Sequence, residues 1–348
     1  MTSRELVRLT LQHRPVERVP RDLWTLPGVH WFRASELEAV LRRFPSDFGV
    51  PSYRYGAAER ARGQPCRRGE YVDAWGCVWH VAEDGIVGEV KEPPLRDLAD
   101  IATYRPPFEL LDGADLSRVN ESCAGSSLFM RVGTETRPFE RLQFLRGTEQ
   151  LLMDLAYGEP EIERLIRMLH EFFCREMEMW AATDVDGVQF MDDWGSQTAL
   201  LISPQMWRDI FKPLYRDYCN ILKSRGKFVF FHSDGNIEEI YPDLIEIGVD
   251  ALNSQLFCMD IERLGELYRG KITFWGEIDR QQVLSFGTPD DVRAAVRRVR
   301  AALDRGQGGV IAQCEWGLET PAENVLAVFE EWDRPLDCLS AGGADRPE

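Results

Sequence analysis

The chain has 348 residues, of which 44% are hydrophobic and 28% are charged, and these fractions are ordinary for a globular protein with a large core. Its formal net charge of −17 argues against partners rich in phosphate, so we expect neither nucleic acid nor an anionic membrane surface as a partner. No apolar stretch is long enough to span a bilayer, and the first residues lack the apolar segment of a signal peptide, which predicts a cytoplasmic protein.

The N-terminal residues predict a helical arm that leads into the first strand. Residues 5–11 are amphipathic, and residues 19–24 form an extended and partly apolar segment. Residues 35–43 have the apolar spacing of a helix, with Ser35 as its N-cap. Residues 48–50 give a weak signal for a second strand.

Residues 71–91 differ from the neighbouring segments in their strand-like composition. They are rich in valine, tryptophan and glycine, and a turn is marked by residues 83–85. We therefore expect a β-hairpin that is inserted over one rim of the main fold. Residues 93–116 are rich in proline and acidic side chains, and they predict a connection with one short helix.

From residue 128 onward, strands and helices alternate. A strand at residues 128–132 leads to helices at residues 148–156 and 160–182. Five further strands follow, and each leads into a helix. The strands are predicted at residues 187–191, 227–231, 250–254, 272–276 and 309–312, and the helices begin near Ser203, Ile237, Asp260, Thr288 and Thr320.

Such alternation requires parallel strands, and eight of them close into a (β/α)8 or TIM barrel. We predict this α/β fold as a single domain over residues 1–335, followed by a frayed tail at residues 336–348. In such a barrel the carboxyl ends of all strands meet at one face, which carries the active site. Polar residues that follow the strands are therefore the candidates for function.

Two predicted strand ends carry side chains that suit a zinc ion. His232 and Asp234 follow an apolar run and are two residues apart, so both can point into the same mouth. Cys314 ends the last strand and would add a thiolate, which completes three ligands and leaves one position open. Glu277 and Asp279 follow another strand and could supply a further oxygen or hold a ligand in place. The competing interpretation is a hydrogen-bonded histidine, a turn aspartate and a buried, inert cysteine.

Asp192 and Asp193 are adjacent carboxylates at the end of another strand. One can face the pocket while the other holds the loop, and neighbouring carboxylates raise each other's pKa, which suits proton transfer. We predict that Asp193, together with Glu277, is catalytic. We expect Asp192 to cap a helix or to form hydrogen bonds within the loop.

Amphipathic and basic side chains could line the substrate pocket. Tryptophan and glutamine can orient a polar ligand, although either tryptophan could equally pack at the rim. Arg131, with Arg137 nearby, could clamp a carboxylate or phosphate, or could merely pair with Glu135. The predicted substrate-binding residues are Trp194, Gln197, Gln255, Trp316 and Arg131.

Several common motifs are missing from the sequence. It contains no GxGxxG, Walker A or GxSxG motif, so binding of dinucleotides or nucleotides and serine hydrolysis receive no support. Its eight cysteines include no CxxC pair. In a reducing compartment, most of them are expected to be small buried hydrophobic residues.

Four segments resemble the uroporphyrinogen decarboxylase superfamily, which also contains zinc-dependent corrinoid methyltransferases. The resemblance covers nearly the whole chain and implies the TIM barrel. The segments are Arg-Pro-Val-Glu-Arg-Val-Pro at residues 14–20, Asp-Asp-Trp-Gly-Ser-Gln at residues 192–197, Phe-His-Ser-Asp-Gly-Asn at residues 231–236 and Glu-Thr-Pro-Ala-Glu-Asn at residues 319–324.

Two departures from the family patterns bear on function. True uroporphyrinogen decarboxylases carry an arginine-rich RQAGRY segment that holds the acidic side chains of a tetrapyrrole, whereas this chain has Trp-Thr-Leu-Pro-Gly at residues 24–28. Decarboxylation of uroporphyrinogen is therefore not expected, although Asp47 matches the position of the decarboxylase's pocket aspartate. The methyltransferase branch binds zinc through a His-x-Cys pair and a later cysteine. His232 and Cys314 match this pattern, and Asp234 replaces the first cysteine.

The resemblance implies a zinc-dependent enzyme that moves a methyl group between a small methylated compound and a corrinoid. No cobalamin-binding domain is apparent in the sequence, so the corrinoid would be carried by a partner protein. An oxygen ligand in place of sulfur favours an oxygen- or nitrogen-bound methyl donor. Two alternatives stay open: a metal-free decarboxylase or related lyase, and a barrel that binds a small ligand without catalysis. The sequence leaves the substrate, the direction of transfer and the oligomeric state, such as a homodimer, undetermined.

Overall fold

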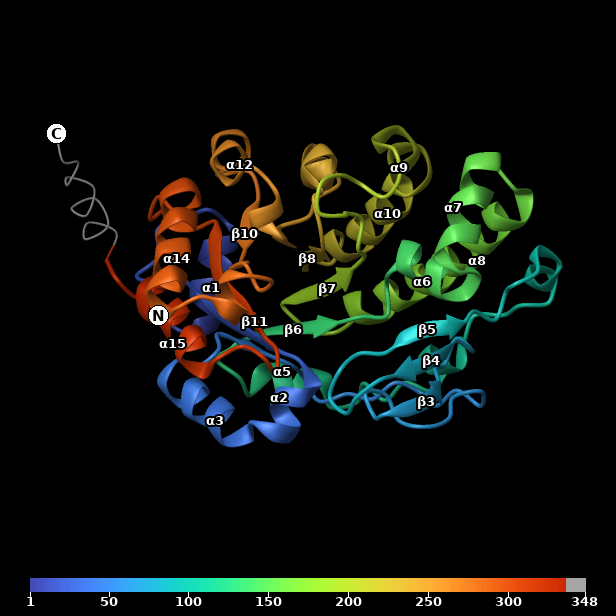
Figure 1. Cartoon of the computed structure of the whole chain (residues 1–348), viewed down its shortest axis with the longest axis horizontal. Coiled ribbons are helices and arrows are strands. Elements are labelled where there is room, and N and C mark those ends of the chain that lie inside the picture. The colour runs from blue at the N-terminus through green and yellow to red at the C-terminus, as the bar shows by residue number, and fades with distance from the viewer. Residues whose placement is uncertain (336–348) are drawn as a thin grey trace.

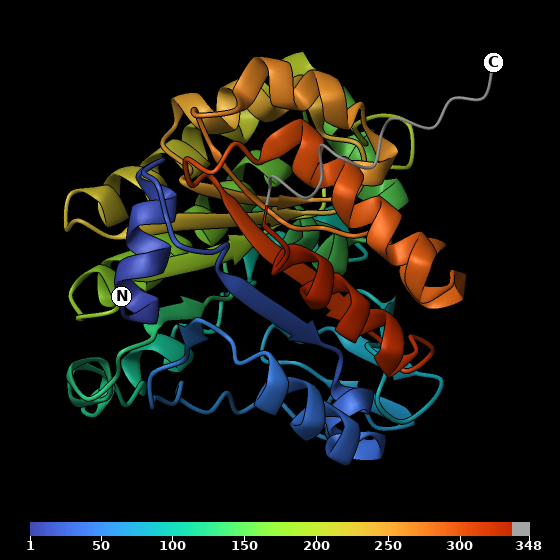
Figure 2. The ribbon, with the colours of Figure 1, turned by 90° about the vertical axis from the view of Figure 1, so that its left-hand side faces the viewer.

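Eight parallel strands form a nearly closed barrel with helices around it, so the predicted TIM-barrel fold is confirmed (Figure 1). The computed structural model describes residues 1–335, and the predicted frayed tail at residues 336–348 lies outside the described residues. The order is β1-β11-β10-β9-β8-β7-β6-β2, and the first strand lies beside the last (Figure 2). The barrel strands are β1 (Arg21–Thr25), β2 (Phe48–Gly49), β6 (Phe129–Gly133), β7 (Gly187–Met191), β8 (Phe228–Ser233), β9 (Ala251–Ser254), β10 (Thr273–Trp275) and β11 (Val310–Trp316).

Helices follow the barrel strands and cover the outside of the barrel. Within residues 1–335, none of them is long and apolar enough to cross a membrane. The helices are α1 (Ser3–Leu11), α2 (Pro27–Phe32), α3 (Ala34–Arg43), α4 (Glu109–Asp112), α5 (Val119–Ala124), α6 (Pro138–Arg146), α7 (Thr148–Tyr157), α8 (Pro160–Ala181), α9 (Pro204–Ile210), α10 (Lys212–Lys223), α11 (Tyr241–Glu246), α12 (Ile261–Tyr268), α13 (Val283–Phe286), α14 (Pro289–Leu303) and α15 (Ala322–Trp332), with short 3₁₀ helices η1 (Leu98–Ala102), η2 (Glu238–Ile240) and η3 (Leu256–Cys258).

Polar side chains start three of the predicted helices. Ser203, Asp260 and Thr288 each accept a hydrogen bond from a backbone amide in the first turn of α9, α12 and α14, respectively, so their predicted role as N-caps is confirmed. A proline at the first helical position follows Ser203 and Thr288. These caps set where each helix leaves the strand that precedes it.

Two predicted caps are wrong. α3 already begins at Ala34, so Ser35 lies inside the helix and cannot cap it. The N-cap of α15 is Pro321, and the hydroxyl of Thr320 lies 3.2 Å from that of Ser285 instead. The N-cap of α3 lies two residues before the predicted one and that of α15 one residue after it, so neither hydroxyl stands where a cap would bind the first free amides of the helix.

The inserted segment forms three antiparallel strands, not the predicted two. β3 (Gly69–Val72), β4 (Val78–Val81) and β5 (Glu89–Glu92) pair in chain order. The additional turn between β3 and β4 is built on Asp73, whose Oδ1 accepts hydrogen bonds from the amides of Trp75 and Cys77, and on Gly76 at φ +89°. Trp75 packs against helix α8 through Phe172, with ring centroids 4.7 Å apart, so this sheet lies against α8 (Figure 1).

Side chains alternate along each barrel strand between the barrel interior and the helix layer. On β8, Val229 and Phe231 belong to the large outer core, whereas Phe230 belongs to a second cluster inside the barrel. On β11, Ala312 belongs to the outer core and Ile311 to the inner cluster. This period of two decides which polar residues near the strand ends can reach the mouth.

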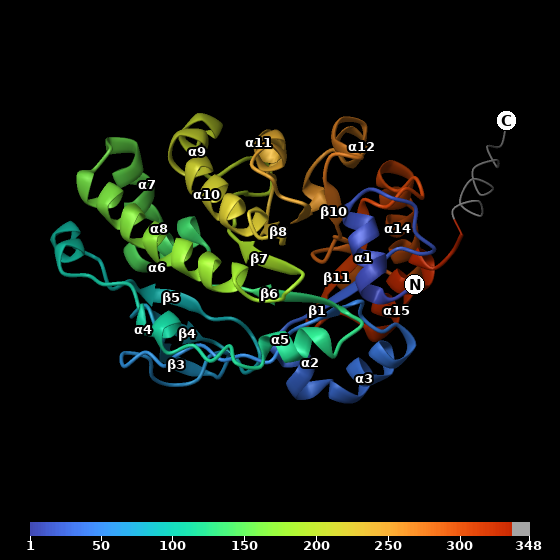
Figure 3. The same ribbon diagram turned by 180° about the vertical axis from the view of Figure 1, so that it is seen from behind.

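α1 is the predicted N-terminal helix, and it closes the barrel at the amino ends of the strands (Figure 3). A capping box between Thr2 and Glu5 starts it. Its Val7 and Leu11 are buried in the inner cluster together with residues of the barrel strands. The helix therefore seals the end of the barrel that lies opposite the polar mouth.

A buried carboxylate attaches α1 to the barrel. Asp186 is 4% exposed and lies directly before β7. It accepts hydrogen bonds from Arg4 Nε at 2.9 Å, from Arg8 Nη2 at 2.6 Å and from the Met130 amide at 2.8 Å. One side chain thus joins the helix to β6 and to the start of β7.

We expect Asp186→Ala to lower the free energy of unfolding by about 2–4 kcal/mol, because two arginines lose their buried carboxylate. Urea denaturation followed by circular dichroism measures this loss. The matched control is Glu38→Ala, which breaks an ion pair to Arg42 whose side chains are 73% and 72% exposed. The control should change the free energy of unfolding by less than about 0.5 kcal/mol, and equal losses in the two variants would contradict the role of Asp186.

Candidate metal centre and active site

His232 lies at the centre of the polar mouth, near the carboxyl end of β8. It is two residues beyond the inward-facing Phe230, so its imidazole also faces the interior. The indole of Trp24 packs against it, with ring centroids 5.3 Å apart. The register places His232 beside Met191 on β7 and Asn253 on β9, so groups from both neighbouring strands can reach it.

The hydrogen bond between His232 and Asn253 determines which imidazole nitrogen is free. Asn253 Nδ2 donates to the carbonyl oxygen of Trp275, which turns Asn253 Oδ1 toward His232. His232 Nδ1 lies 2.5 Å from that oxygen and therefore carries the proton and donates it. In a neutral imidazole, Nε2 then presents its lone pair to the mouth. Metal-binding histidines are oriented in the same way.

Two carboxylates converge on Nε2 of His232. Asp234 Oδ1 lies 3.5 Å from it and Asp193 Oδ1 lies 3.6 Å from it, which is longer than a usual hydrogen bond. These spacings are close to the ligand–ligand edge of a zinc tetrahedron, about 3.3 Å for bonds of about 2.0–2.1 Å. Asp234 Oδ1 is buried and has no hydrogen-bond partner. A cation placed between the three groups would satisfy it, so the donor set fits a metal ion.

Arg280, which follows β10, joins three carboxylates of the mouth. Its Nη2 donates to Asp234 Oδ2, its Nη1 donates to Glu315 Oε1 at 2.8 Å, and its Nε lies 3.3 Å from Glu277 Oε1. Because the guanidinium occupies Oδ2 of Asp234, Oδ1 is the oxygen that is directed at His232. Arg280 therefore orients one side chain of the candidate metal centre.

Glu277 is a buried carboxyl group beside the centre. Burial raises its pKa to about 8, although Arg280 acts to lower it. Neither carboxyl oxygen has a hydrogen-bond partner, because the contact with Arg280 does not have hydrogen-bond geometry. A carboxyl group with this pKa can hold a proton near neutral pH, which is what a general acid requires.

Glu140, which no pattern in the sequence marks as functional, is a second carboxyl group of this kind. It lies in the first turn of α6. Burial and then the negative charge of Asp193 raise its pKa to about 8, and Arg137, 3.8 Å away, acts in the opposite direction. The mouth therefore holds two carboxyl groups that retain protons where exposed acids would not.

Asp192 has the structural role expected for it. Its carboxylate accepts hydrogen bonds from the amides of Phe139 and Glu140, both at 2.7 Å, and from the hydroxyl of Tyr215 at 2.6 Å. It therefore caps α6, and it fixes the loop that carries Asp193. A cap of α9 is supplied by Ser203 instead.

Two cavities border the centre. The larger, of about 420 Å³, is lined by β1, β2, β6, β7 and β11 and includes Trp24 and Glu315. The smaller, of about 150 Å³, lies over the ends of β9 and β10. Two predicted substrate-binding residues, Gln197 and Gln255, line this smaller cavity, and Glu277 and Arg280 line it too. The structure thus brings these four side chains together.

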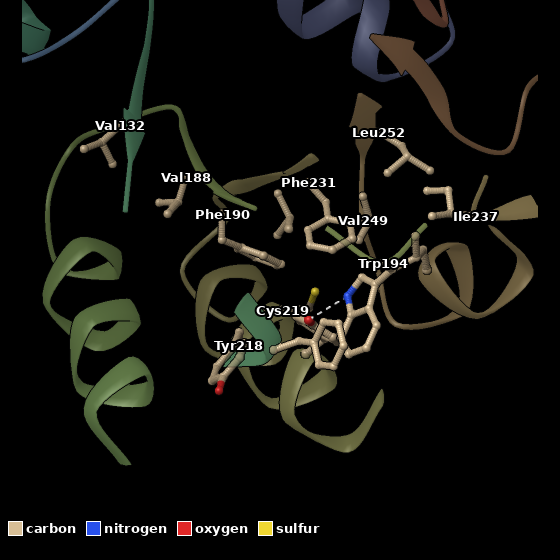
Figure 4. Packing of buried hydrophobic residues seen from close by; sticks show 14 of the residues in the cluster. Val132, Val188, Phe190, Trp194, Tyr218, Cys219, Phe231, Ile237, Val249 and Leu252 are labelled. Carbon is tan, nitrogen blue, oxygen red and sulfur yellow. Dashed lines mark hydrogen bonds between the residues drawn. The ribbon is translucent and has the colours of Figure 1, made fainter. Parts of the chain in front are cut away.

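The two predicted tryptophans are buried in the outer core. Trp194 stacks on Phe139, with ring centroids 4.1 Å apart, and its Nε1 donates to the hydroxyl of Tyr215 at 2.9 Å (Figure 4). Trp316 is equally buried, and its Nε1 donates to the carbonyl oxygen of Thr320. Neither side chain reaches the mouth, so the predicted ligand contacts of Trp194 and Trp316 are corrected to core packing.

Cys314 faces the helix layer and not the mouth. It is fully buried in the outer core, and burial raises the pKa of its thiol well above the usual value. On β11 the polar Gln313 and Glu315 alternate with the apolar residues, and this pattern in the sequence already indicates that Glu315 faces inward. The predicted ligand set is therefore corrected: Asp193, and not Cys314, lies beside His232.

Arg131 is inside the barrel but is already paired. Its Nη1 donates to Asp22 Oδ2 at 2.9 Å, and its guanidinium lies over the rings of Phe48 and Trp275 at 4.5 and 4.4 Å. It lines the larger cavity. The predicted alternative partner, Glu135, binds Arg141 instead.

Asp47 is not a pocket residue. It is buried at the closed end of the barrel, where it accepts hydrogen bonds from Ser3, Arg18 and the amide of Arg21. The expectation that Asp47 takes the place of the decarboxylase's pocket aspartate is therefore wrong. In this chain Asp47 joins the N-terminal segment to the start of β1.

The raised pKa of Glu277 makes stability depend on pH. Between its ordinary value of 4.5 and about 8, the folded protein keeps a proton that the unfolded chain has lost, so the free energy of unfolding falls as pH rises through this window. We expect Glu277→Gln to stabilise the metal-free protein relative to the wild type, by an amount that grows from about pH 5 to about pH 8.5. Urea denaturation in the presence of a chelator measures the difference.

A matched control for this titration is Glu262→Gln. A hydrogen bond from Arg298 lowers the pKa of Glu262 to about 2, so its charge stays constant over the same range. Its effect on stability should not change between about pH 5 and about pH 8.5. A constant or opposite difference for Glu277→Gln would show that Glu277 is ionised throughout.

The family model of uroporphyrinogen decarboxylase (URO-D) matches residues 72–334. The match covers more than half of the chain and includes every residue of the candidate metal centre. Curated proteins offer no match to this sequence.

Solved structures share the fold. A methyltransferase from Methanosarcina mazei is 17% identical, with a TM-score of 0.71, over 96% of this chain and 98% of that chain. A chitinase from Flavobacterium johnsoniae is 10% identical, with a TM-score of 0.37, over 91% of this chain and 94% of that chain, and this similarity is too low to support an inference. The family model matches most of the chain, including the strands of the barrel from β6 onward and the residues of the polar mouth. The chain therefore belongs to the uroporphyrinogen decarboxylase family.

Proposed function

We propose that the protein is a zinc-dependent methyltransferase that moves a methyl group between a small methylated compound and a corrinoid bound to a partner protein. The convergence of Asp193, His232 and Asp234 at the mouth is the observation that carries this proposal. Membership of the URO-D family and the fold shared with the Methanosarcina mazei methyltransferase support it.

The residues of the centre suit zinc in kind and number. One imidazole nitrogen and two carboxylate oxygens make three protein ligands, and catalytic zinc sites commonly combine three protein ligands with one open position. The side chains of Asp193 and Asp234 are 38% and 28% exposed, so a substrate can approach them from the mouth. Zinc bound there would supply a Lewis acid for the heteroatom that carries the methyl group.

A ligand set without sulfur has a consequence for the substrate. Thiolate ligands make zinc softer and favour sulfur substrates, whereas oxygen and nitrogen ligands make it harder. With Cys314 buried behind the strand, the candidate ligands are one nitrogen and two oxygens. We infer that the methyl group is carried on oxygen or nitrogen rather than on sulfur.

Glu277 is the residue that we assign to proton transfer. It lines the smaller cavity, and its carboxyl group can hold a proton near neutral pH. Asp193, for which the sequence suggested the same role, belongs with the metal ligands in this proposal. A proton from Glu277 would neutralise a heteroatom that leaves as an anion.

The decarboxylase alternative finds less support in the charges of the mouth. A carboxylated substrate needs a cation that is not already neutralised. Arg131 is paired with Asp22, and Arg280 with Asp234 and Glu315. A barrel that only binds a ligand, the other alternative, predicts no activity that depends on His232.

We expect the purified protein to contain about one zinc per chain and to lose it in His232→Ala. Because Cys314 lies behind the strand, Cys314→Ala should retain the metal. Elemental analysis of both variants measures zinc, and circular dichroism checks that they are folded. Zinc lost from Cys314→Ala but kept in His232→Ala would contradict the assigned ligands.

The same proteins test the activity. They are incubated with cob(I)alamin and a set of methylated amines, ethers and thioethers, and the absorbance of cob(I)alamin is followed. The wild type and Cys314→Ala should consume cob(I)alamin with at least one compound that carries its methyl group on oxygen or nitrogen. His232→Ala should be inactive, and transfer that is independent of His232 would refute the proposed function.

Asn253 is expected to affect zinc affinity without touching the metal. Because it holds the imidazole of His232 in the productive tautomer, Asn253→Ala should weaken zinc binding by about 10–100-fold. Competition with a chromophoric chelator measures the affinity. Ser254→Ala is the matched control, because Ser254 is also buried on β9 but contacts Tyr241 on the outer side, and its affinity should equal that of the wild type.

A further inference from the structure

The smaller cavity contains a buried carboxyl group without a hydrogen-bond partner. Glu277 is 3% exposed, and it lines this cavity of about 150 Å³. Both of its oxygens are buried, and neither accepts a hydrogen bond. A buried acceptor without a donor is costly, so the cavity is completed by a ligand that supplies hydrogen-bond donors.

The charges around the cavity favour a cation. Glu277 and Asp279 line it, and Arg280 is the one basic side chain among its lining residues, all of which are in the described part of the chain. The guanidinium of Arg280 donates to Asp234 and Glu315, and its Nε lies 3.3 Å from Glu277 Oε1 without a hydrogen bond. One guanidinium thus faces three carboxyl groups, so once Glu277 is ionised, it and Asp279 carry more negative charge than Arg280 neutralises.

A thiol in the same cavity responds to this field. Cys258 lines the cavity, and its pKa is raised to about 11, first by burial and then by the negative charges of Glu277, Asp234 and Asp279. Burial disfavours any ion in the cavity, but the part of the shift that comes from the negative charges favours a cation over a small anion.

Three of the glutamine side chains that line the cavity make hydrogen bonds within the protein. Gln197 Nε2 donates to Gln281 Oε1 at 3.0 Å, and Gln255 Oε1 accepts from the amide of Gly235 at 3.0 Å. They form part of the wall of the cavity, and Glu277 supplies its buried acceptor oxygens without a hydrogen-bond partner. The two oxygens of one carboxylate can both accept hydrogen bonds from a ligand nitrogen that carries two N–H groups.

We propose that this cavity binds a small primary or secondary ammonium ion, whose N–H groups donate to the carboxylate of Glu277. This inference rests on the proposed function for its meaning, because transfer of a proton from the ion to ionised Glu277 would leave the neutral amine, whose lone pair a zinc ion can bind and which would gain or lose the methyl group. The cavity shares Arg280 with the candidate metal centre, so a ligand there lies next to Asp234. Quaternary ammonium ions have no N–H and do not fit this requirement.

The test is a ligand-observed NMR titration of the metal-free wild type with dimethylammonium, without any corrinoid. A suitable condition is about pH 9, where Glu277 is ionised and an alkylammonium is still protonated. We expect saturable binding with a Kd on the order of 1 mM, as befits a ligand of a few atoms. Ethanol, which has the same size without the charge, together with acetate and tetramethylammonium, should bind at least about tenfold more weakly.

Two glutamine variants locate the site. Glu277→Gln should weaken the binding of dimethylammonium by about tenfold or more, because one charge-assisted acceptor is lost. The matched control is Glu140→Gln, which removes another buried carboxyl group of the mouth outside this cavity and should change the affinity by less than about threefold. Circular dichroism checks the folding of both variants, and the comparison of ligands on the wild type stands if Glu277→Gln does not fold.

Each result bears on the proposal. Absence of saturable binding of dimethylammonium, equal or tighter binding of ethanol, acetate or tetramethylammonium, or unchanged binding by Glu277→Gln overturns the assignment of an ammonium site. Because the titration uses metal-free protein without a corrinoid, its outcome is independent of zinc content and methyl transfer. Zinc and activity lost in His232→Ala, with no ammonium binding in the wild type, would overturn the substrate class and leave the proposed function intact.

Discussion

The period of two along parallel strands is the constraint on which the whole mouth depends. It turns His232 inward on β8, with Asp234 directly after the strand, and it turns Asn253 inward on the neighbouring strand, where it reaches the imidazole. A slip of β8 by one residue would place Phe231 at the mouth and His232 among the helices. The hydrogen bonds to β7 and β9, on both sides of β8, prevent that slip. The chemistry of the centre is therefore a property of the barrel and not of one loop.

Charge in the mouth is organised around one guanidinium. Arg280 holds Asp234 and Glu315 by hydrogen bonds and stands beside Glu277, so it lies between the candidate metal ligand Asp234 and the carboxyl group to which we assign proton transfer. The environments of Asp234 and Glu277 differ, because Asp234 accepts a hydrogen bond from Arg280 whereas Glu277 is buried and accepts none. Because carboxyl groups in different environments hold their protons differently, one small site can contain a metal ligand, a proton donor and a group that binds a substrate.

The residues that stabilise the barrel and the residues of the candidate site lie at opposite ends of it. At the closed end, Asp186 and Asp47 bind arginines of the N-terminal segment and attach α1 to the strands. At the open end, the loops after the strands supply Asp193, Arg280 and the lining of both cavities. TIM barrels commonly divide these tasks in this way, because the loops can vary without disturbing the strands.

The alternating pattern of strands and helices was sufficient to predict the barrel, the helical arm and the pair His232 and Asp234, because these follow from local periodicity. The sequence also contained the signal that Cys314 faces outward, in the polar residues on either side of it. Only the tertiary structure decided that Asp193 completes the centre and that Arg280 occupies one oxygen of Asp234. Those contacts join residues that are about 40 positions apart in the chain, and closure of the barrel creates them through register and loop geometry that no local pattern encodes.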